Sequence, residues 1–169
     1  MNATRTLAEQ HRAIELLFER GARQRSASSR ERAVSRLAEE LIAHLASEET
    51  VFYPAVRAVL LADRLTAARL RRRHLTMRRG LRRLLESDPG DPAFAERMVA
   101  LRGVFESHAA DQEGALFPRV CGAFGEAELE VLGADIRASR PPVWVVTTES
   151  GLLRGRHGGL SARSAVSLP

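Results

Sequence analysis

The chain of 169 residues and 18.6 kDa has the size of one domain with a short extension. Its 44% of apolar and 28% of charged residues are an ordinary globular balance, which argues against disorder of the whole chain. The net charge is +5, with arginine in place of lysine throughout, and the only cysteine, Cys121, excludes both an internal disulfide and a cysteine-based zinc cluster.

Apolar residues recur at helical spacing through residues 1–138, and the alternation of a strand is missing there. We predict four helices, carried in chain order by the apolar patterns of residues 7–18, 34–61, 70–85 and 94–132. Thr4 or Thr6 is expected to cap the first helix and Asp63 the third. A serine-rich stretch separates the first two patterns, and segment 87–92, rich in Asp, Pro and Gly, is the clearest loop.

Four helices of this length, joined by short loops, predict an all-α fold. The simplest arrangement is an up-down-up-down antiparallel four-helix bundle over residues 1–140. After Pro141 and Pro142 the helical period is lost, and Gly, Ser and Arg dominate residues 141–169. We therefore predict a largely disordered C-terminal tail.

The second and fourth predicted helices carry the same motif 64 positions apart, at residues 44–54 and 108–118. Each copy starts with a histidine, has polar residues four and five positions later, and ends in an aromatic residue followed by proline. The first and third helices align at an offset of 63, which superposes His11 on His74. Two such halves, related by a pseudo-twofold axis, place four histidines around the bundle axis: His11, His44, His74 and His108.

Histidine and glutamate four residues apart lie on one face of a helix, so both side chains can reach a metal ion between helices. Imidazole and carboxylate together suit iron, and manganese or zinc would also fit. A lone histidine on an apolar face is commonly a core residue. Four of them, however, would need partners for all their ring nitrogens within a core of Leu, Met, Phe and Ala. The matched set therefore favours a metal site.

The pattern resembles the hemerythrin-like family, also called the HHE cation-binding domain, over roughly residues 4–138. The resemblance is carried by His11 in Glu-Gln-His-Arg-Ala-Ile, by His74, and by the two histidine motifs that end in Pro54 and Pro118. Members of this family are four-helix bundles that hold a non-haem di-iron centre. The resemblance therefore implies two iron ions as the cofactor.

Carried over residue by residue, the resemblance implies four terminal histidine ligands and a bridging carboxylate from Glu48. Four positions after His108 the second motif has Gln112, whose neutral amide is a poor bridge between two cations. Glu113 follows at position +5, where oxygen-carrying hemerythrins also place their carboxylate. An ideal helix turns +5 away from the histidine by about 140°, but a wide π-type turn beside Pro118 would bring it back. We therefore predict Glu113 rather than Gln112 as the second bridge. The predicted metal ligands are His11, His44, Glu48, His74, His108 and Glu113.

The third helix also departs from the oxygen carriers, because Arg78 stands where they have a further histidine. One metal is then left with an open or water-filled position, which argues against oxygen transport. It favours sensing of oxygen or nitric oxide, peroxide handling, or iron handling. Arg78 would either hold an anion at the metal or point outward. The alternatives are a catalase-like or other oxidoreductase activity at the di-iron centre, and a metal-free basic bundle that serves interactions. No residue is assigned a catalytic role.

Eight arginines and no acidic residue occupy positions 69–83. With His74 inward, Arg72, Arg79 and Arg83 are predicted to face outward, either as a patch for an anionic partner or as a solvated helix face. A helix-turn-helix or RNA-module signature is missing, so a nucleic-acid partner is not expected. No apolar run approaches the roughly 18 residues of a membrane span, and no secretory signal is evident, so we expect a cytoplasmic protein without a membrane partner.

Overall fold

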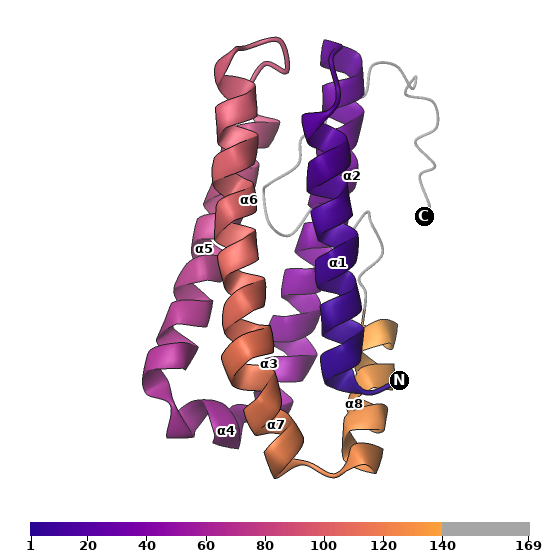
Figure 1. Cartoon of the computed structure of the whole chain (residues 1–169), viewed down its shortest axis with the longest axis vertical. Coiled ribbons are helices and arrows are strands. Elements are labelled where there is room, and N and C mark those ends of the chain that lie inside the picture. Colours follow the sequence, from indigo (N-terminus) through magenta and orange to yellow (C-terminus); the bar gives the residue numbers. More distant parts are fainter. Residues whose placement is uncertain (140–169) are drawn as a thin grey trace, which may run out of the picture.

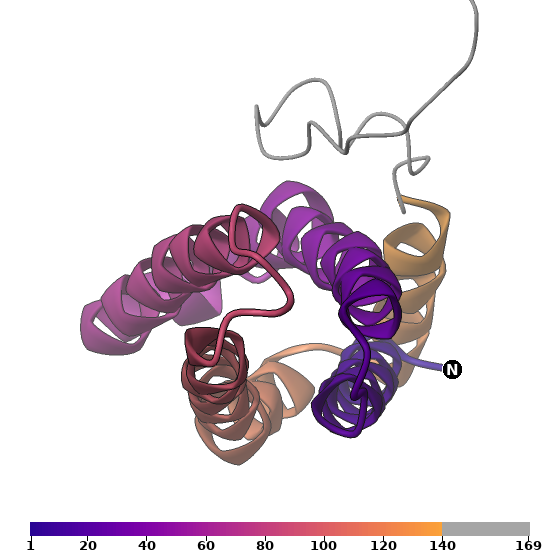
Figure 2. The ribbon, with the colours of Figure 1, turned by 90° about the horizontal axis from the view of Figure 1, so that it is seen from above.

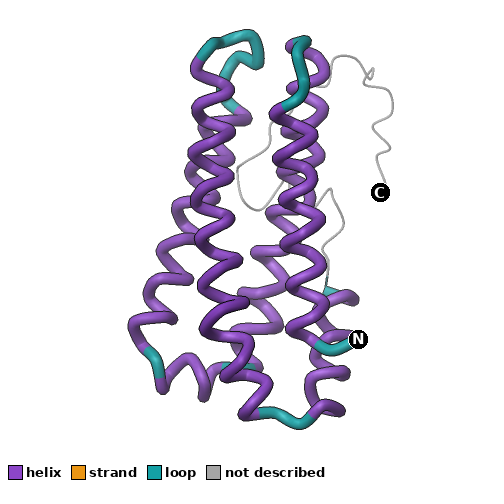
Figure 3. Tube along the Cα trace, viewed as in Figure 1, coloured by secondary structure: helices purple, strands orange, loops and turns teal. Residues whose placement is uncertain are grey.

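The computed structural model describes residues 1–139, and every regular element in that range is a helix (Figure 3). The prediction of an all-α fold is confirmed. The predicted C-terminal tail and the domain boundary at residue 140 lie outside the described residues. No described helix is both long enough and apolar enough to cross a membrane.

Four long helical stretches make up most of the described chain, and Figure 1 shows them side by side, with shorter helices gathered at one end. The elements, with η for a helix of wide π-type turns, are α1 (Ala3–Ala22), α2 (Ala27–Ser47), η1 (Glu48–Phe52), α3 (Tyr53–Ala55), α4 (Arg57–Ala62), α5 (Arg64–Leu85), α6 (Ala93–Asp111), η2 (Gln112–Leu116), α7 (Phe117–Ala123) and α8 (Glu126–Ala138). Two of the long stretches are α1 and α5. The other two are α2 continued through η1 and α3, and α6 continued through η2 and α7.

The four long stretches enclose a common core. α1 packs against α2 and α6, α2 packs against α5, and α5 packs against α6, so that the contacts close into a ring (Figure 2). The buried positions on α1 include Leu7, His11, Ile14 and Phe18. These residues share one face because positions three or four apart meet on the same side of a helix.

Two short helices, α4 and α8, are additional to the four that the sequence predicts. The fourth pattern, expected to continue past Pro118 toward Leu132, is interrupted at Phe124, whose extended backbone (φ −121°, ψ 145°) ends α7. The chain then enters α8, which packs against α1. Gly133 lies so close to the start of the chain that a Cβ on it would be 2.6 Å from the Met1 carbonyl oxygen. This close approach requires glycine.

Helix caps agree with the sequence at α5 and differ at α1. Asp63 caps α5 as predicted, because its side chain accepts a hydrogen bond from the Thr66 N–H at 3.0 Å. At α1 the cap is Asn2 rather than Thr4 or Thr6. Both threonines are buried within the first turns of the helix, which begins earlier than its apolar pattern suggests.

Two apolar clusters fill the core, and the histidines lie between them. The larger cluster includes Phe18, Leu41, Leu81 and Phe105. The smaller cluster includes Leu7, Phe52, Leu70 and Phe117. His11 contacts both, since its ring centroid lies 5.8 Å from that of Phe105 and 6.1 Å from that of Phe117. The polar centre is thus enclosed by apolar side chains on two sides.

Candidate metal centre

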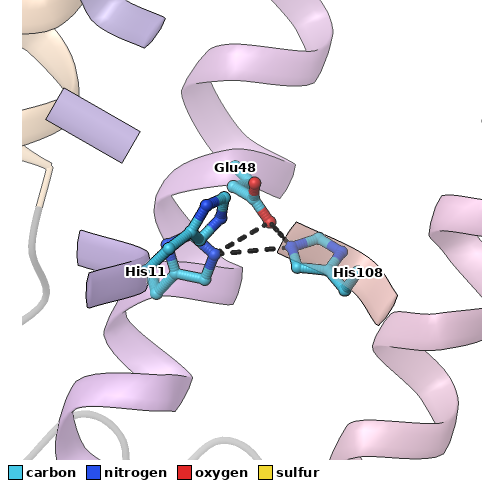
Figure 4. A group of neighbouring side chains, drawn as sticks. His11, Glu48 and His108 are labelled. Carbon is cyan, nitrogen blue, oxygen red and sulfur yellow. Dashed lines mark hydrogen bonds and ion pairs between the residues drawn. The ribbon is translucent and has the colours of Figure 1, made fainter. Parts of the chain in front are cut away.

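One buried histidine comes from each of the four long helical stretches. They are His11 of α1, His44 of α2, His74 of α5 and His108 of α6, each at most 3% exposed. Every one lies on the buried face of its helix, so the packing of the four faces brings the imidazoles together. Figure 4 shows His11 and His108 converging on Glu48 from separate helices.

The chain widens in the same way after His44 and after His108. In both copies the regular α-helix gives way to π-type turns that begin four residues beyond the histidine. In the second copy the Phe117 N–H donates to the Gln112 carbonyl, five residues earlier. Pro118 favours this turn because it lacks the N–H that a regular α-helix would use. The π-type turn predicted beside Pro118 is therefore present.

Glu48 stands at the centre of the imidazoles. It is fully buried, and its Oε2 lies 2.9 Å from His74 Nε2, 3.2 Å from His108 Nε2 and 3.5 Å from His44 Nε2. Four of these residues form a compact group, in which the ligating atoms all lie within 4.8 Å of one another: His11, His44, Glu48 and His108. Three imidazole nitrogens and one carboxylate can therefore surround a single ion.

Outer hydrogen bonds orient three of the imidazole rings. Their Nδ1 atoms bond to oxygen acceptors at 2.7–2.9 Å, which are Glu113 for His11, Gln10 for His44 and Glu49 for His74. Carboxylate and amide oxygens only accept, so each Nδ1 carries the proton. In neutral His11 and His44 the inner Nε2 then presents a lone pair to the centre. Metal-binding histidines are commonly held in this manner.

Burial and charge set the protonation of the centre. Burial lowers the pKa of His11 and, more strongly, that of His44, so both are neutral at pH 7. Burial acts in the same direction on His74, but its hydrogen bonds to Glu48 and Glu49 outweigh it and raise the pKa to about 9. Burial alone would raise the pKa of Glu48, yet the histidines around it, His44 foremost, hold it well below the usual range. The ionised carboxylate thus faces neutral His11 and His44, and also the protonated His74.

Several buried polar atoms in the centre call for a cation. His11 Nε2 and Gln112 Oε1 have no hydrogen-bond partner among the described residues. His44 Nε2 lies 3.5 Å both from His108 Nε2 and from Glu48 Oε2. The acceptor atom His44 Nε2 therefore faces the acceptor Glu48 Oε2 away from water, and the two acceptors named first have no described partner, which is unfavourable unless a cation binds there. The donor set fits a metal ion.

The sequence predicts that Glu113 faces the histidines and that Gln112 does not, and the structure shows the reverse. Gln112 is fully buried, and its Nε2 donates to Glu48 Oε1. Glu113 is 44% exposed and reaches His11 Nδ1 from outside the centre. The prediction that a wide turn carries Glu113 to the histidine face is therefore wrong. The wide bond starts at Gln112, so position +4 keeps the face of His108 and position +5 is turned aside.

Sequence reasoning missed two residues that orient histidines. Gln10 accepts from His44 Nδ1 and Glu49 accepts from His74 Nδ1. The internal repeat contained a signal for Glu49, because it occupies the +5 position that Glu113 has in the other copy. No such signal exists for Gln10, which reaches from α1 to a histidine on α2.

Arg78 takes the outward orientation that the sequence left open. Its Nη2 lies 2.7 Å from Glu49 Oε2, so it supports the carboxylate that orients His74. Within the same arginine run, Arg73 Nη2 lies 2.9 Å from Asp111 Oδ2. The three arginines predicted to face outward are exposed, namely Arg72, Arg79 and Arg83. Acidic residues of neighbouring elements therefore offset part of the basic run.

Comparison with known proteins agrees with this fold and donor set. The family model of the Hemerythrin HHE cation binding domain matches residues 2–120. Among solved structures, the chain is similar to a Hemerythrin HHE cation binding domain-containing protein, the Rv2633c homolog from Mycobacterium kansasii. The TM-score is 0.73 at 24% identity, over 89% of this chain and 94% of the other. No curated protein matches the chain. The chain belongs to the hemerythrin HHE cation-binding domain family, as its sequence motifs predict.

Replacing Glu113 by glutamine is expected to weaken metal binding by about tenfold. The amide oxygen can still accept from His11 Nδ1, but the negative charge that increases the basicity of the imidazole is lost. A competition titration against a chelator measures the affinity. Glu9→Gln, an exposed position on α1, serves as the matched control and should bind as the parent does. Equal affinity in both variants would contradict a role for the Glu113 charge.

Proposed function

We propose that this protein binds non-haem iron at the centre of its histidines. The observation that carries the proposal is the buried group of three imidazoles and the Glu48 carboxylate, whose ligating atoms all lie within 4.8 Å of one another. His11, His44 and His108 would bind the ion together with Glu48, and His74 would flank it. Iron suits imidazole and carboxylate ligands, while manganese or zinc would also bind to them.

We also propose the topology of the fold around this centre, the location of the protein and its role. The four long helical stretches would form the up-down-up-down antiparallel bundle of hemerythrin type, and the protein would work in the cytoplasm. Its role would be a response to oxygen, nitric oxide or peroxide, or the handling of iron. Oxygen transport is not proposed, because Arg78 pairs with Glu49 and adds no further imidazole.

A pocket beside the centre supports access by a small molecule. Its volume is about 320 Å³, and its lining includes His74, Tyr53 and the apolar Leu60 and Leu70. The Tyr53 hydroxyl accepts from Gln112 Nε2 at 2.7 Å and lies 3.1 Å from His74 Nε2. Burial raises the pKa of Tyr53, so the hydroxyl keeps its proton. This proton is donated to Glu48 Oε2 over a long 3.4 Å, and it could turn instead toward a molecule that enters from this side, where bound iron would supply the redox chemistry.

The same pocket favours a second candidate function, a catalase-like activity. If the protein is a catalyst, the iron-loaded form should consume peroxide through many turnovers, and His74→Ala should lose this activity because His74 lines the pocket. A single stoichiometric reaction with peroxide would instead favour sensing or iron handling.

The proposal is tested by the metal content after anaerobic loading with ferrous iron and desalting. The parent should retain iron and His44→Ala should lose it, because His44 is buried and supplies one of the four grouped ligating atoms. His157→Ala, at the fifth histidine of the sequence, which is not among the described residues, is the matched control and should retain iron. If the parent retains none, the proposal fails and the metal-free interaction bundle becomes the better interpretation.

A further inference from the structure

Gln112 and Glu48 are equivalent positions of the internal repeat, and they meet at the centre. Each follows its histidine by four residues, and the two side chains are hydrogen-bonded to each other across the bundle. We infer that Gln112 limits this centre to one metal ion, where the family resemblance predicts two. The inference rests on the proposed function, since it concerns the number of ions in the same site.

The two oxygens of Glu48 are used differently. Oε2 faces the ring nitrogens of His44, His74 and His108. Oε1 accepts a hydrogen bond from Gln112 Nε2. A carboxylate that bridges two ions commonly binds one with each of its oxygens. In this chain the second oxygen is already bound to an amide N–H, so Glu48 can act as a terminal ligand but not as a bridge of this kind.

The amide of Gln112 is fixed in this orientation. Its Nε2 donates to the Tyr53 hydroxyl at 2.7 Å as well as to Glu48, and the side chain is fully buried. An amide nitrogen has no free lone pair with which to bind a cation. The end of Gln112 that faces Glu48 is therefore the end that cannot act as a ligand.

The remaining donors are sufficient for one ion and not for a second. The first position has His11 Nε2, which lacks any partner among the described residues, with His44, His108 and Glu48 within 4.8 Å. A second ion would have to rely on His74, whose Nε2 already lies 2.9 Å from Glu48 Oε2 and 3.1 Å from the Tyr53 hydroxyl. The unpartnered Gln112 Oε1 could add one neutral oxygen, but it brings no charge to balance a second cation. Glu113, the predicted second bridge, lies outside the centre.

Restoring the carboxylate by Gln112→Glu should restore the second site. The new side chain would remove the N–H from Glu48 Oε1 and add an anion that both ions can share. The expected metal content after anaerobic ferrous loading, measured by elemental analysis, is about one ion per chain in the parent and about two in the variant. Gln24→Glu makes the same change in charge at a surface position of the first loop, and this control should still bind about one ion per chain.

A second measurement keeps the inference testable if Gln112→Glu does not fold. Loaded with manganese, the parent should give the resolved electron paramagnetic resonance spectrum of isolated ions. The intensity of this spectrum should equal that expected for all of the bound manganese. Two ions sharing a bridge would couple and broaden this spectrum.

The failures of the two proposals are distinguishable. About two ions per parent chain, or a coupled manganese spectrum, overturns the inference and leaves the proposed function intact. A folded Gln112→Glu variant that stays at about one ion also overturns it, because Gln112 would then not set the number. A parent that retains no metal overturns the proposed function itself.

Discussion

A divalent metal ion at about 100 times its dissociation constant is expected to raise the free energy of unfolding of this protein by about 2.7 kcal/mol. Glu48→Gln should lose nearly all of this stabilisation. Glu48 is the only carboxylate whose oxygen lies among the imidazole nitrogens of the described centre. Glutamine keeps the shape of the side chain and removes the charge that binds the cation.

Thermal or urea unfolding with and without metal gives this difference for each variant separately. Comparing each protein with its own metal-free form removes the effect of the substitution on folding itself. Glu106→Gln is the control, since Glu106 is exposed and its partner among the described residues is Arg102 on its own helix. A metal-induced stabilisation of Glu48→Gln equal to that of the parent would show that the ion binds elsewhere.

Phe105→Ala is expected to lower the free energy of unfolding by about 3–5 kcal/mol. Phe105 is fully buried in the larger apolar cluster, where its ring lies 5.7 Å from that of Phe18. It also forms one wall of the histidine centre, 5.8 Å from the ring of His11 and 6.3 Å from that of His44. Truncation would leave a cavity that joins the apolar core to the polar centre.

Urea unfolding of the metal-free protein measures this loss. Val99→Ala, at a position of the same helix that is 67% exposed, should change the stability by less than about 0.5 kcal/mol. A loss below about 1 kcal/mol in Phe105→Ala would mean that the core closes around the truncated side chain. The separation between core and centre would then be less rigid than the contacts indicate.

The helical period accounts for what could be predicted about the fold. It placed the histidines on the apolar faces, and those faces are buried in the structure. It could not place α8, because its apolar residues continue the pattern of the preceding helix while the backbone at Phe124 turns the chain back. Whether an apolar pattern is one helix or two depends on which surface it packs against. Here α8 covers α1, and the close contact of Gly133 with the first residues makes this possible.

The sequence by itself determined the all-helical fold, the family, and the helix faces on which the histidines and Glu48 lie. Residues three and four positions apart share a helix face regardless of context. Only the tertiary structure decided which of Gln112 and Glu113 faces the histidines. Their orientations depend on where the wide turn begins and on what each side chain meets across the bundle. Gln112 meets Glu48 from the opposite motif, and Glu113 meets His11 on α1. These contacts join residues far apart in the chain, and the spacing within one helix carries no information about them.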